Sequence, residues 1–313
     1  PRDEGRVLPM MAGAPPGAEA VCGVVVVDKP AGPTSHDVVD RVRRLFSTRR
    51  VGHAGTLDPP ATGVLLVGLG RATRILQFLQ ALPKTYRAVV AFGETTTTQD
   101  ATGEVVERRF CSFARHDLEA AAAGMVGEIS QVPPMVSAVR VHGERLYLAA
   151  RRGEEVERPA RAVTVYGLDV SAFDPEAWEA TLLVRCSSGT YVRTLAADLG
   201  ERLACGAHVR ALRRLAVGSL GVGEAVSLER LEAMDAARRQ DAVLPMGVAL
   251  RDFHAVTVSG DELEAVGHGR ALEEPMAGAG AADAPVPLVD PSGRLVAVYR
   301  CRDGRLRPAA VLL

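Results

Sequence analysis

The apolar residues of this chain fall into short runs that follow two different spacings. Residues 21–28, VCGVVVVD, are mostly β-branched and end at the turn sequence KPAGP, which predicts a buried strand. From Ser35 the apolar positions recur at helical spacing through Phe46, which predicts a helix capped by Ser35 with arginines on its other faces. The fold is therefore expected to begin with a strand followed by an amphipathic helix.

The same two patterns alternate along the rest of the chain. They predict strands over residues 64–67, 86–92, 104–110, 163–170, 178–186 and 208–217. They predict helices over residues 73–82 and 117–125, from Thr190 onward, and over 227–239. Such a mixture indicates a folded α and β protein, and the 47% hydrophobic and 24% charged residues agree with that class.

Three features suggest how the chain is divided. Residues 1–20 mix acids, Pro, Gly and Ala without the basic and apolar regions of a secretory signal, which predicts a disordered tail. Residues 133–159 have prolines at both ends, inner glycines and five arginines, which predicts a protruding, mobile, basic insertion. A shift in charge near Arg251 predicts a boundary between a larger domain, 21–250, and a small β-rich domain, 251–313.

Several classes of protein are excluded by what the sequence lacks. No apolar run approaches the roughly 20 residues of a membrane-spanning helix, so no membrane partner is expected. The five cysteines are irregularly spaced, which indicates reduced core residues and a cytoplasmic location. Residues 64–73 resemble a dinucleotide-binding turn but lack its third glycine, and no phosphate-loop or metal-ligand spacing occurs. We therefore expect no cofactor and no metal.

The charge distribution leaves the question of a nucleic-acid partner open. The formal net charge is −1, which argues against such a partner. Residues 41–74, however, hold seven arginines and one acid, and on one face they would create a field that attracts polyanions. The alternative is that these arginines lie on ordinary solvated faces and bind no polyanion. Only Lys29 and Lys84 are lysines, so a compositional bias explains the arginines equally well.

One loop in this basic stretch places a carboxylate at a tight turn. Residues 52–63, GHAGTLDPPATG, contain three glycines and two prolines around Asp58. A carboxylate in a positive field stays ionised even when partly desolvated, which suits a nucleophile or a general base. The alternative is an aspartate that merely forms a turn before proline.

Two other segments offer polar side chains next to a helix or a strand. In residues 187–194, SSGTYVRT, Tyr191 and Arg193 fall in the first helical turn, where Arg193 could pair with a buried carboxylate or lie unpaired on the surface. In KTYR, residues 84–87, Tyr86 offers an aromatic face beside cations, or simply packs half-buried in the sheet.

These motifs together resemble a known family. The segments KPAG (29–32), GHAGTLDPPATG (52–63), KTYRA (84–88), CSSGTYVRTLAADLG (186–200) and GAHVRALRRL (206–215) are similar, in order and spacing, to bacterial, actinobacterial-like members of the TruB family of tRNA pseudouridine synthases. The resemblance covers about residues 21–220. It implies an α+β pseudouridine synthase fold with a mixed, mainly antiparallel central sheet flanked by helices. It also implies that residues 133–159 form a thumb and that residues 251–313 form a small, PUA-like RNA-binding domain.

The resemblance also implies an activity and a set of site residues. The family isomerises uridine 55 in the T-loop of tRNA, which must first leave its stack. Asp58 corresponds to the catalytic aspartate, Tyr86 to the aromatic residue that stacks on the base, and Arg193 to the ion-pair partner of Asp58. Five residues are expected to bind the substrate: His53, Tyr191, Lys29, Leu212 and Arg214.

The same resemblance carries expectations about partners. It implies contact with the T-loop and T-stem of tRNA, a monomeric enzyme, and neither metal nor cofactor. This chain has Ser188 where the family often has lysine, and Thr97 where it often has an acid, with Asp100 nearby. A second hypothesis is a tRNA-binding or folding module in which modification is secondary, and this hypothesis does not need Asp58.

Overall fold

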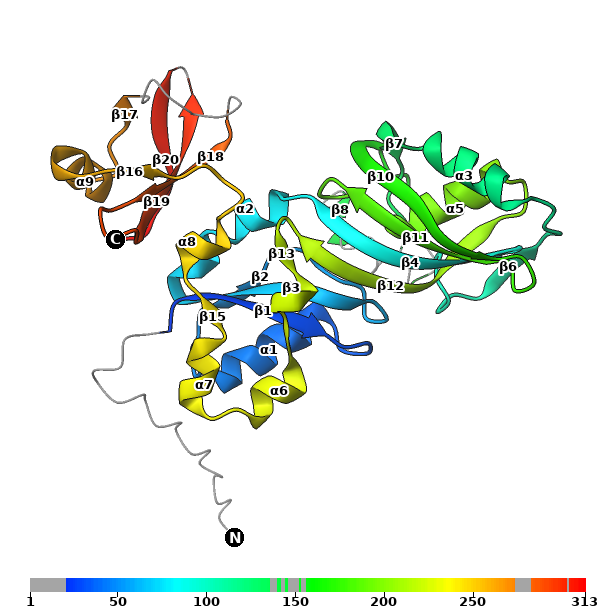
Figure 1. Cartoon of the computed structure of the whole chain (residues 1–313), viewed down its shortest axis with the longest axis horizontal. Helices are drawn as coiled ribbons and strands as arrows, with labels where there is room; N and C mark the ends of the chain where they lie inside the picture. Colours follow the sequence, from blue (N-terminus) through cyan, green and yellow to red (C-terminus); the bar gives the residue numbers. More distant parts are fainter. Residues whose placement is uncertain are drawn as a thin grey trace, which may run out of the picture.

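A computed structural model describes residues 21–135, 140–141, 144–145, 152, 156–273, 283–302 and 304–313. The tail predicted over residues 1–20 lies outside these residues, as does much of the thumb insertion. Over the described residues, one large mixed sheet forms the centre and a smaller β-rich unit follows at the C-terminus (Figure 1).

The large sheet has eleven strands among the described residues, and its main path runs β14-β1-β3-β12-β4-β11-β10-β7. The strands of this path, from one edge to the other, are β14 (Val226–Ser227), β1 (Gly23–Lys29), β3 (Thr62–Leu69), β12 (Ala207–Val217), β4 (Lys84–Phe92), β11 (Glu179–Cys186), β10 (Arg161–Asp174) and β7 (Gly127–Gln131). Short strands β2 (Val51–His53), β13 (Leu220–Gly221) and β15 (Val243–Leu244) pair beside it. Only the β1–β14 and β3–β12 pairings of this sheet are parallel among the described residues, so the expected mixed, mainly antiparallel sheet is confirmed.

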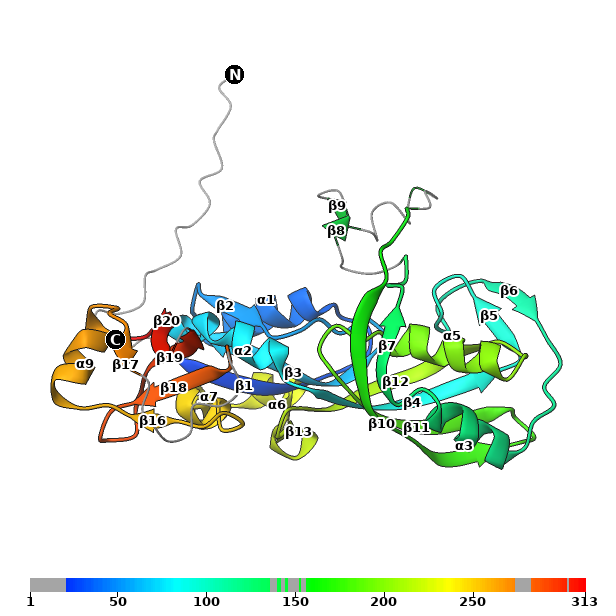
Figure 2. The same cartoon turned by 90° about the horizontal axis from the view of Figure 1, so that it is seen from above.

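Helices cover the two halves of this sheet differently. Around β1 and β3, α1 (Ser35–Leu45) and α6 (Leu228–Ala233) pack on one face, and α2 (Leu76–Ala81) and α8 (Met246–Ala249) pack on the other. Around β4, β11 and β10, α3 (Arg115–Ala123) and α5 (Val192–Arg202) cover one face only (Figures 1 and 2). The opposite face of these strands exposes Arg87, Leu183 and Arg185.

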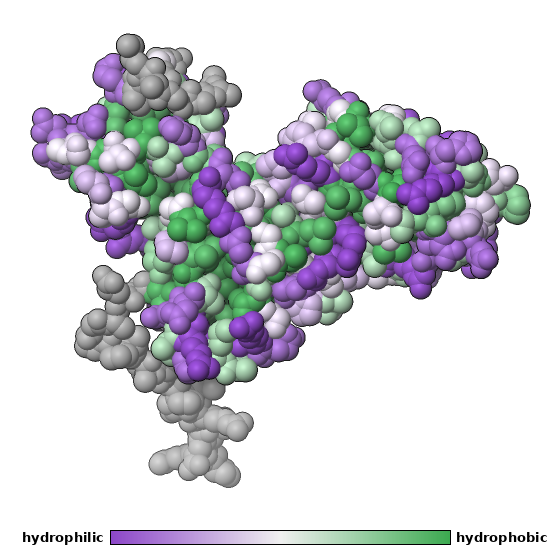
Figure 3. All heavy atoms as spheres, in the orientation of Figure 1, coloured by the Kyte–Doolittle hydropathy of each residue, from purple (hydrophilic) through white to green (hydrophobic). Residues whose placement is uncertain are grey.

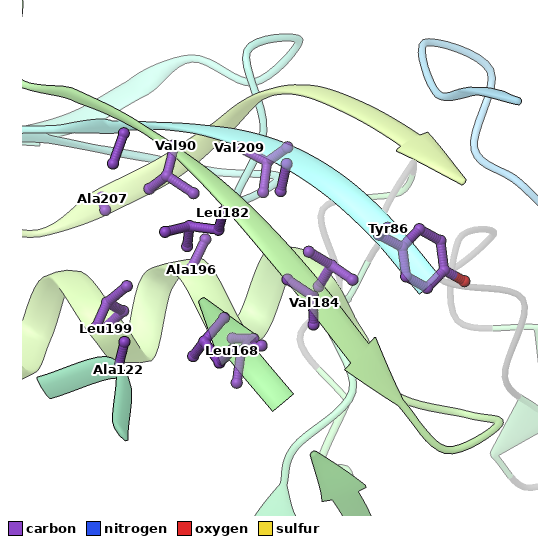
Figure 4. Close-up of a cluster of buried hydrophobic side chains, with 14 of the residues drawn as sticks. Tyr86, Val90, Ala122, Leu168, Leu182, Val184, Ala196, Leu199, Ala207 and Val209 are labelled. Carbon is purple, nitrogen blue, oxygen red and sulfur yellow. The ribbon is translucent and has the colours of Figure 1, made fainter. Parts of the chain in front are cut away.

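The core beneath β4, β11 and β10 is mainly aliphatic toward α5, and an aromatic group of Phe92, Phe113, Phe173 and Trp178 packs against it. Val90, Leu182 and Val184 point from the strands toward Ala196 and Leu199 of α5 (Figure 4). Alternate residues of β4 are buried, as the period of two in a half-covered strand requires. Tyr86 ends this row, with its hydroxyl directed away from the aliphatic side chains (Figure 4).

The C-terminal unit is built on five strands in the order β16-β18-β19-β20-β17. These are β16 (Val256–Thr257), β17 (Leu272–Glu273), β18 (Pro285–Val289), β19 (Leu295–Arg302) and β20 (Arg305–Val311), with α9 (Gly260–Gly267) beside them. Leu312 and Val298 join the core that contains Phe78 of α2. The unit therefore packs firmly against the main sheet, and the boundary placed near Arg251 stays a prediction.

The remaining short elements connect these layers. They are the 3-10 turns η1 (Gly70–Arg74) and η2 (Val222–Glu224), helix α7 (Ala236–Asp241), and the hairpins β5 (Glu94–Thr96) with β6 (Val105–Arg108) and β8 (Arg140–Val141) with β9 (Glu144–Arg145). The β8–β9 hairpin lies within residues 133–159, where the insertion is predicted, and projects from the body of the molecule (Figure 2).

Three local predictions were wrong. Thr34, not Ser35, caps α1, because the Thr34 hydroxyl accepts a hydrogen bond from the Asp37 amide and the Asp37 carboxylate accepts one from the Thr34 amide, which forms a capping box. The helix expected over 73–82 begins instead as the 3-10 turn η1. The helix expected over 227–239 is broken into α6 and α7, because Met234 is extended and Asp235 caps the second helix.

Candidate active site

The loop that carries Asp58 runs between β2 and β3, and side chains from neighbouring elements hold its main chain by hydrogen bonds. Ser35, the first residue of α1, accepts a hydrogen bond from the Leu57 amide at 2.9 Å and donates one to the Leu57 carbonyl at 3.0 Å. The Lys29 ammonium, at the end of β1, donates to the carbonyls of Pro30 (3.0 Å), Pro59 (3.0 Å) and Ala61 (2.8 Å). The main chain on both sides of Asp58 is therefore held in place.

Arg214 of β12 is a second buried cation beneath the same loop. Its guanidinium donates to the carbonyls of Val64 (2.7 Å), Gly55 (3.0 Å) and Thr56 (3.4 Å). At Gly63, φ is +103° and a Cβ atom would lie 2.1 Å from the Arg214 carbonyl oxygen, so only glycine fits this approach. The glycines of the loop thus allow β12 to come close enough for Arg214 to reach it.

Asp58 forms an ion pair with Arg193, which lies in the first turn of α5. Nη2 of Arg193 lies 3.0 Å from Oδ2 of Asp58, and Nη1 lies 3.4 Å from Oδ2 of Asp100. Nη1 also donates to the Thr98 carbonyl at 2.9 Å. The Arg193 side chain is only 4% exposed whereas that of Asp58 is 38% exposed. The unpaired surface arginine considered as the alternative is thus excluded, and the carboxylate stays reachable.

Opposing effects set the protonation of Asp58. Burial raises the pKa of the Asp58 carboxyl above its ordinary value, the Arg193 guanidinium lowers this pKa, and the Asp100 carboxylate raises it again. The net direction is upward, so the positive field does not offset the whole cost of burial. A carboxylate with a raised pKa is a stronger base, and the arginine fork holds its oxygen in a fixed direction.

Tyr86 lies near the start of β4 with its ring in the core and its hydroxyl directed away from the aliphatic side chains. Burial raises the pKa of the Tyr86 phenol above its ordinary value, although the charge of Arg214 and its hydrogen bond to the hydroxyl oppose this. The phenol is therefore protonated at neutral pH. Its position suits contact with the face of a planar base better than proton abstraction.

A cavity of about 320 Å³ opens beside Asp58. Six residues expected from the sequence line it: Asp58, Tyr86, Tyr191, Arg193, Leu212 and Arg214. Lys84 and Ser188 line it as well. The cavity is large enough to receive a nucleobase with its ribose.

Two of the expected substrate-binding residues do not line this cavity among the described residues. Lys29 is fully buried, and burial lowers the pKa of its ammonium to about 8. It contacts loop carbonyls, which gives it a role in shaping the loop. His53 of β2 has a buried Nδ1 without a hydrogen-bond partner, and burial together with Arg214 lowers its pKa, so the ring is neutral at pH 7.

The sequence reasoning gave little weight to the loop over residues 97–103, which carries Asp100. The loop is fixed to β12, since the Val209 amide donates to the Gln99 carbonyl and the Ala101 amide donates to the Val209 carbonyl, both at 3.0 Å. Gln99 adopts φ +60°, a left-handed conformation that turns Asp100 inward. A threonine-rich stretch followed by Asp-Ala-Thr-Gly was the available signal for this turn.

The arginines of residues 41–74 do not form one basic face. Arg71 and Arg74 donate to the carbonyls of Leu312 and Val311, so they hold the C-terminal strand. Arg43 pairs with Asp40 on the same helix. Arg49 and Arg50, which are exposed, remain suited to bind phosphate groups.

The described part of the chain offers neither a cluster of metal ligands nor a membrane-spanning helix. Within the described residues, no three His, Cys, Asp or Glu side chains gather closely enough to hold a metal ion. In the same part of the chain, no helix has the length and apolar character that crossing a bilayer requires.

Comparisons with known proteins agree with the geometry. Residues 43–192 match the model of the TruB family pseudouridylate synthase N-terminal domain, residues 193–251 match the tRNA pseudouridylate synthase B C-terminal domain, and residues 253–313 match the tRNA pseudouridine synthase II C-terminal region.

Full-length relatives extend this match. The tRNA pseudouridine synthase B of Thermobifida fusca is 48% identical over 92% of this chain and 98% of that protein. The protein of the same name from an Arthrobacter species is 45% identical over 92% of this chain and 96% of its own. A chain in the crystal structure of a Cbf5-Nop10-Gar1 complex superposes with a TM-score of 0.71 at 26% identity, over 93% of this chain and 83% of that one. The chain therefore belongs to the TruB family of pseudouridylate synthases.

Proposed function

We propose that the cavity beside Asp58 receives uridine 55 from the T-loop of tRNA and that Asp58 drives its isomerisation to pseudouridine. The chain is a tRNA pseudouridine synthase, as its family and its 48% identical relative indicate. The observation that carries the assignment of the site is the Asp58–Arg193 pair, in which a half-exposed carboxylate at the cavity is held at 3.0 Å by a buried guanidinium.

The chemistry asks for one well-placed carboxylate. Isomerisation breaks the bond between ribose C1′ and uracil N1, turns the base, and joins C1′ to C5. The C5 proton is released and N1 gains a proton, so there is no net oxidation or hydrolysis. Asp58 can act by attacking C1′, by attacking C6 or by removing a ribose proton, and each route requires its ionised form.

The other cavity residues are assigned by where they lie. Tyr86 stacks on the uracil, and Leu212 and Tyr191 close the cavity around it. Arg193 keeps Asp58 charged and oriented. Lys29 and Arg214 act as positioning residues, because their donors bind loop carbonyls. His53, neutral and next to the loop, contacts the RNA where the base has left its stack.

Binding must offset the cost of extruding a nucleotide from a folded loop, which is a few kcal/mol. The exposed arginines at residues 49–50, the thumb insertion and the C-terminal unit are proposed to contact the T-stem and its phosphates.

We further propose that the enzyme works as a monomer in the cytoplasm. Gel filtration with light scattering tests the first of these two statements, and fractionation of cells tests the second.

Asp58→Asn tests the function directly. The variant and the unmodified enzyme are incubated with tRNA labelled with tritium at uridine C5, and released tritium is counted. We expect turnover to disappear while tRNA affinity stays within about threefold, because the amide keeps the shape but lacks the charge. Retained turnover would remove Asp58 from the reaction, whereas lost turnover with intact tRNA binding supports the enzyme over the binding-module hypothesis.

A further inference from the structure

One buried amide connects the stem of the thumb insertion to the active site. Gln131 is the last residue of β7, opposite Arg161 of β10, where the chain enters and leaves the insertion. Its side chain is 2% exposed. Oε1 of Gln131 accepts a hydrogen bond from the Tyr191 amide at 2.7 Å, and Nε2 donates to the Tyr191 carbonyl at 3.0 Å. The side chain therefore pairs with both main-chain groups of one residue.

The residue that Gln131 holds begins the helix that carries Arg193. Tyr191 is the N-cap of α5, and its carbonyl also accepts the first intrahelical bond, from Leu195, at 3.0 Å. The side chain of Tyr191 forms no cap bond, and Oε1 of Gln131 accepts from the N-cap amide, as the N3 side chain does in a capping box. The direction in which α5 starts therefore depends on this amide.

The other side of the same helical turn is held by a second glutamine. Thr194 donates through its hydroxyl to Oε1 of Gln99 at 3.0 Å. Arg193 lies between these two attachments, and its guanidinium reaches Asp58, Asp100 and the Thr98 carbonyl at once. Because a guanidinium is a rigid fork, a shift of the turn would break some of these contacts. Misplacements of about 1 Å are known to cost up to roughly a hundredfold in rate.

We propose that Gln131 is a positioning residue for the isomerisation, which acts by fixing the start of α5 and through it the Arg193 guanidinium against Asp58. This inference rests on the proposed function. It also gives the thumb insertion a fixed mechanical link to the carboxylate, since the strand that leads into the insertion ends at Gln131.

The test uses Gln131→Met, which keeps the length and neutrality of the side chain but removes both hydrogen bonds. Single-turnover tritium release and tRNA affinity are measured over a range of pH. We expect a rate roughly 10- to 100-fold lower with affinity within about threefold. We also expect the acidic limb of the rate profile to move to higher pH, since a displaced Arg193 lowers the Asp58 pKa less. A residue that only stabilises the fold would lower the melting temperature without moving this limb.

Further variants keep the test informative if Gln131→Met folds poorly. Gln131→Glu retains the acceptor for the Tyr191 amide, so its rate is expected to lie between that of the unaltered enzyme and that of Gln131→Met. Thr194→Val removes the hydrogen bond to Gln99 and so loosens the same turn from the other side. Gln240→Glu, on the exposed face of α7, is the matched control and should leave the rate and its pH profile unchanged.

The inference is overturned if folded Gln131→Met turns over at the normal rate, or if its loss lies in tRNA affinity alone, or if its rate falls without a shift of the acidic limb. Each of these results with an inactive Asp58→Asn variant leaves the proposed function standing. An active Asp58→Asn variant instead removes the proposed role of Asp58, so the failure of this inference and the failure of that proposal are distinguishable.

Discussion

The two halves of the large sheet use buried positive charge for different purposes. Helices cover both faces of the half around β1 and β3. There the Lys29 ammonium donates hydrogen bonds to main-chain carbonyls of the Asp58 loop, and so does the Arg214 guanidinium of the adjoining β12. In the half covered on one face, α5 delivers Arg193 to the Asp58 carboxylate itself. The active site lies where the halves meet, at the parallel contact between β3 and β12.

Because the cations have different partners, their removal should affect different properties of the protein: the stability of the fold or the rate of the reaction. A cation bound to carbonyls shapes the backbone, so its loss leaves buried acceptors unsatisfied and should destabilise the fold. A cation bound to a reactive carboxylate controls charge and direction, so its loss should reduce the rate more than the stability. Substitutions in the two halves can therefore test whether shape and charge are controlled separately.

Among substitutions of the buried cations, the largest effect on rate is expected for Arg193→Leu. The leucine removes the guanidinium that lowers the Asp58 pKa and leaves two carboxylates facing each other. We expect single-turnover tritium release to fall by about 10³-fold or more, with a smaller fractional loss in affinity for tRNA. Arg193→Lys is the matched control and should recover part of the rate, since it restores the charge but not the fork. A variant that loses stability but keeps its rate would contradict the distinction.

Lys29→Met should mainly affect stability. Three loop carbonyls lose their donor, and we expect the free energy of unfolding in urea to fall by about 2–4 kcal/mol. Burial lowers the Lys29 pKa from its ordinary 10.5 to about 8, so the unfolded chain binds the proton more tightly than the folded one. Stability of the unaltered protein should therefore rise between pH 8 and pH 10 in comparison with the variant. An unchanged difference over that range would show that the ammonium is not desolvated.

The sequence predicts which residues belong to the site better than it predicts which of them shape the backbone and which act on the substrate. Asp58, Tyr86 and Arg193 stand in motifs with fixed spacing, and the alternating strands identified the sheet that brings them together. Lys29 and Arg214 could be found in the same motifs, but their residue types do not show whether their donors face a substrate or buried carbonyls. That distinction depends on the approach of β12 to Gly63, a contact over 150 residues of sequence.

Other features depended on long-range packing that a local pattern does not record. Asp100 reaches Arg193 only because the left-handed Gln99 is held against β12. The use of Arg71 and Arg74 on C-terminal carbonyls could not be predicted, because a charge count does not show whether an exposed arginine donates to a main-chain carbonyl or faces solvent. Gln131 belonged to no motif considered, since a glutamine at the end of a strand has no chemical signature of its own.

A shift in pH dependence, with a smaller change in rate, is expected for Asp100→Asn. The Asp100 carboxylate raises the Asp58 pKa, so its neutralisation should lower that pKa. The isomerisation needs ionised Asp58, and its rate is lost as the pH falls through the folded pKa. The acidic limb should therefore move to lower pH, provided that the asparagine oxygen keeps its contact with Arg193. A limb that moves to higher pH would mean that Asp100 acts chiefly by orienting Arg193.

The smallest effect is expected on the open face of the sheet. Arg87 of β4 stands next to Leu183 of β11 on the strand face that no helix of the described residues covers. Over the face of the molecule drawn in Figure 3, apolar and hydrophilic surface are intermixed. Its neighbour in the strand, Tyr86, points to the cavity on the opposite face, as the alternation of a strand requires. Arg87→Ala should change the free energy of unfolding by about 0.5 kcal/mol or less and leave both tritium release and tRNA affinity unaltered. Thr85→Ala on the same face is a suitable companion variant. A loss of tRNA affinity in Arg87→Ala would show that the uncovered half of the sheet also contacts RNA. The two halves would then differ in RNA binding as well as in how their buried cations act.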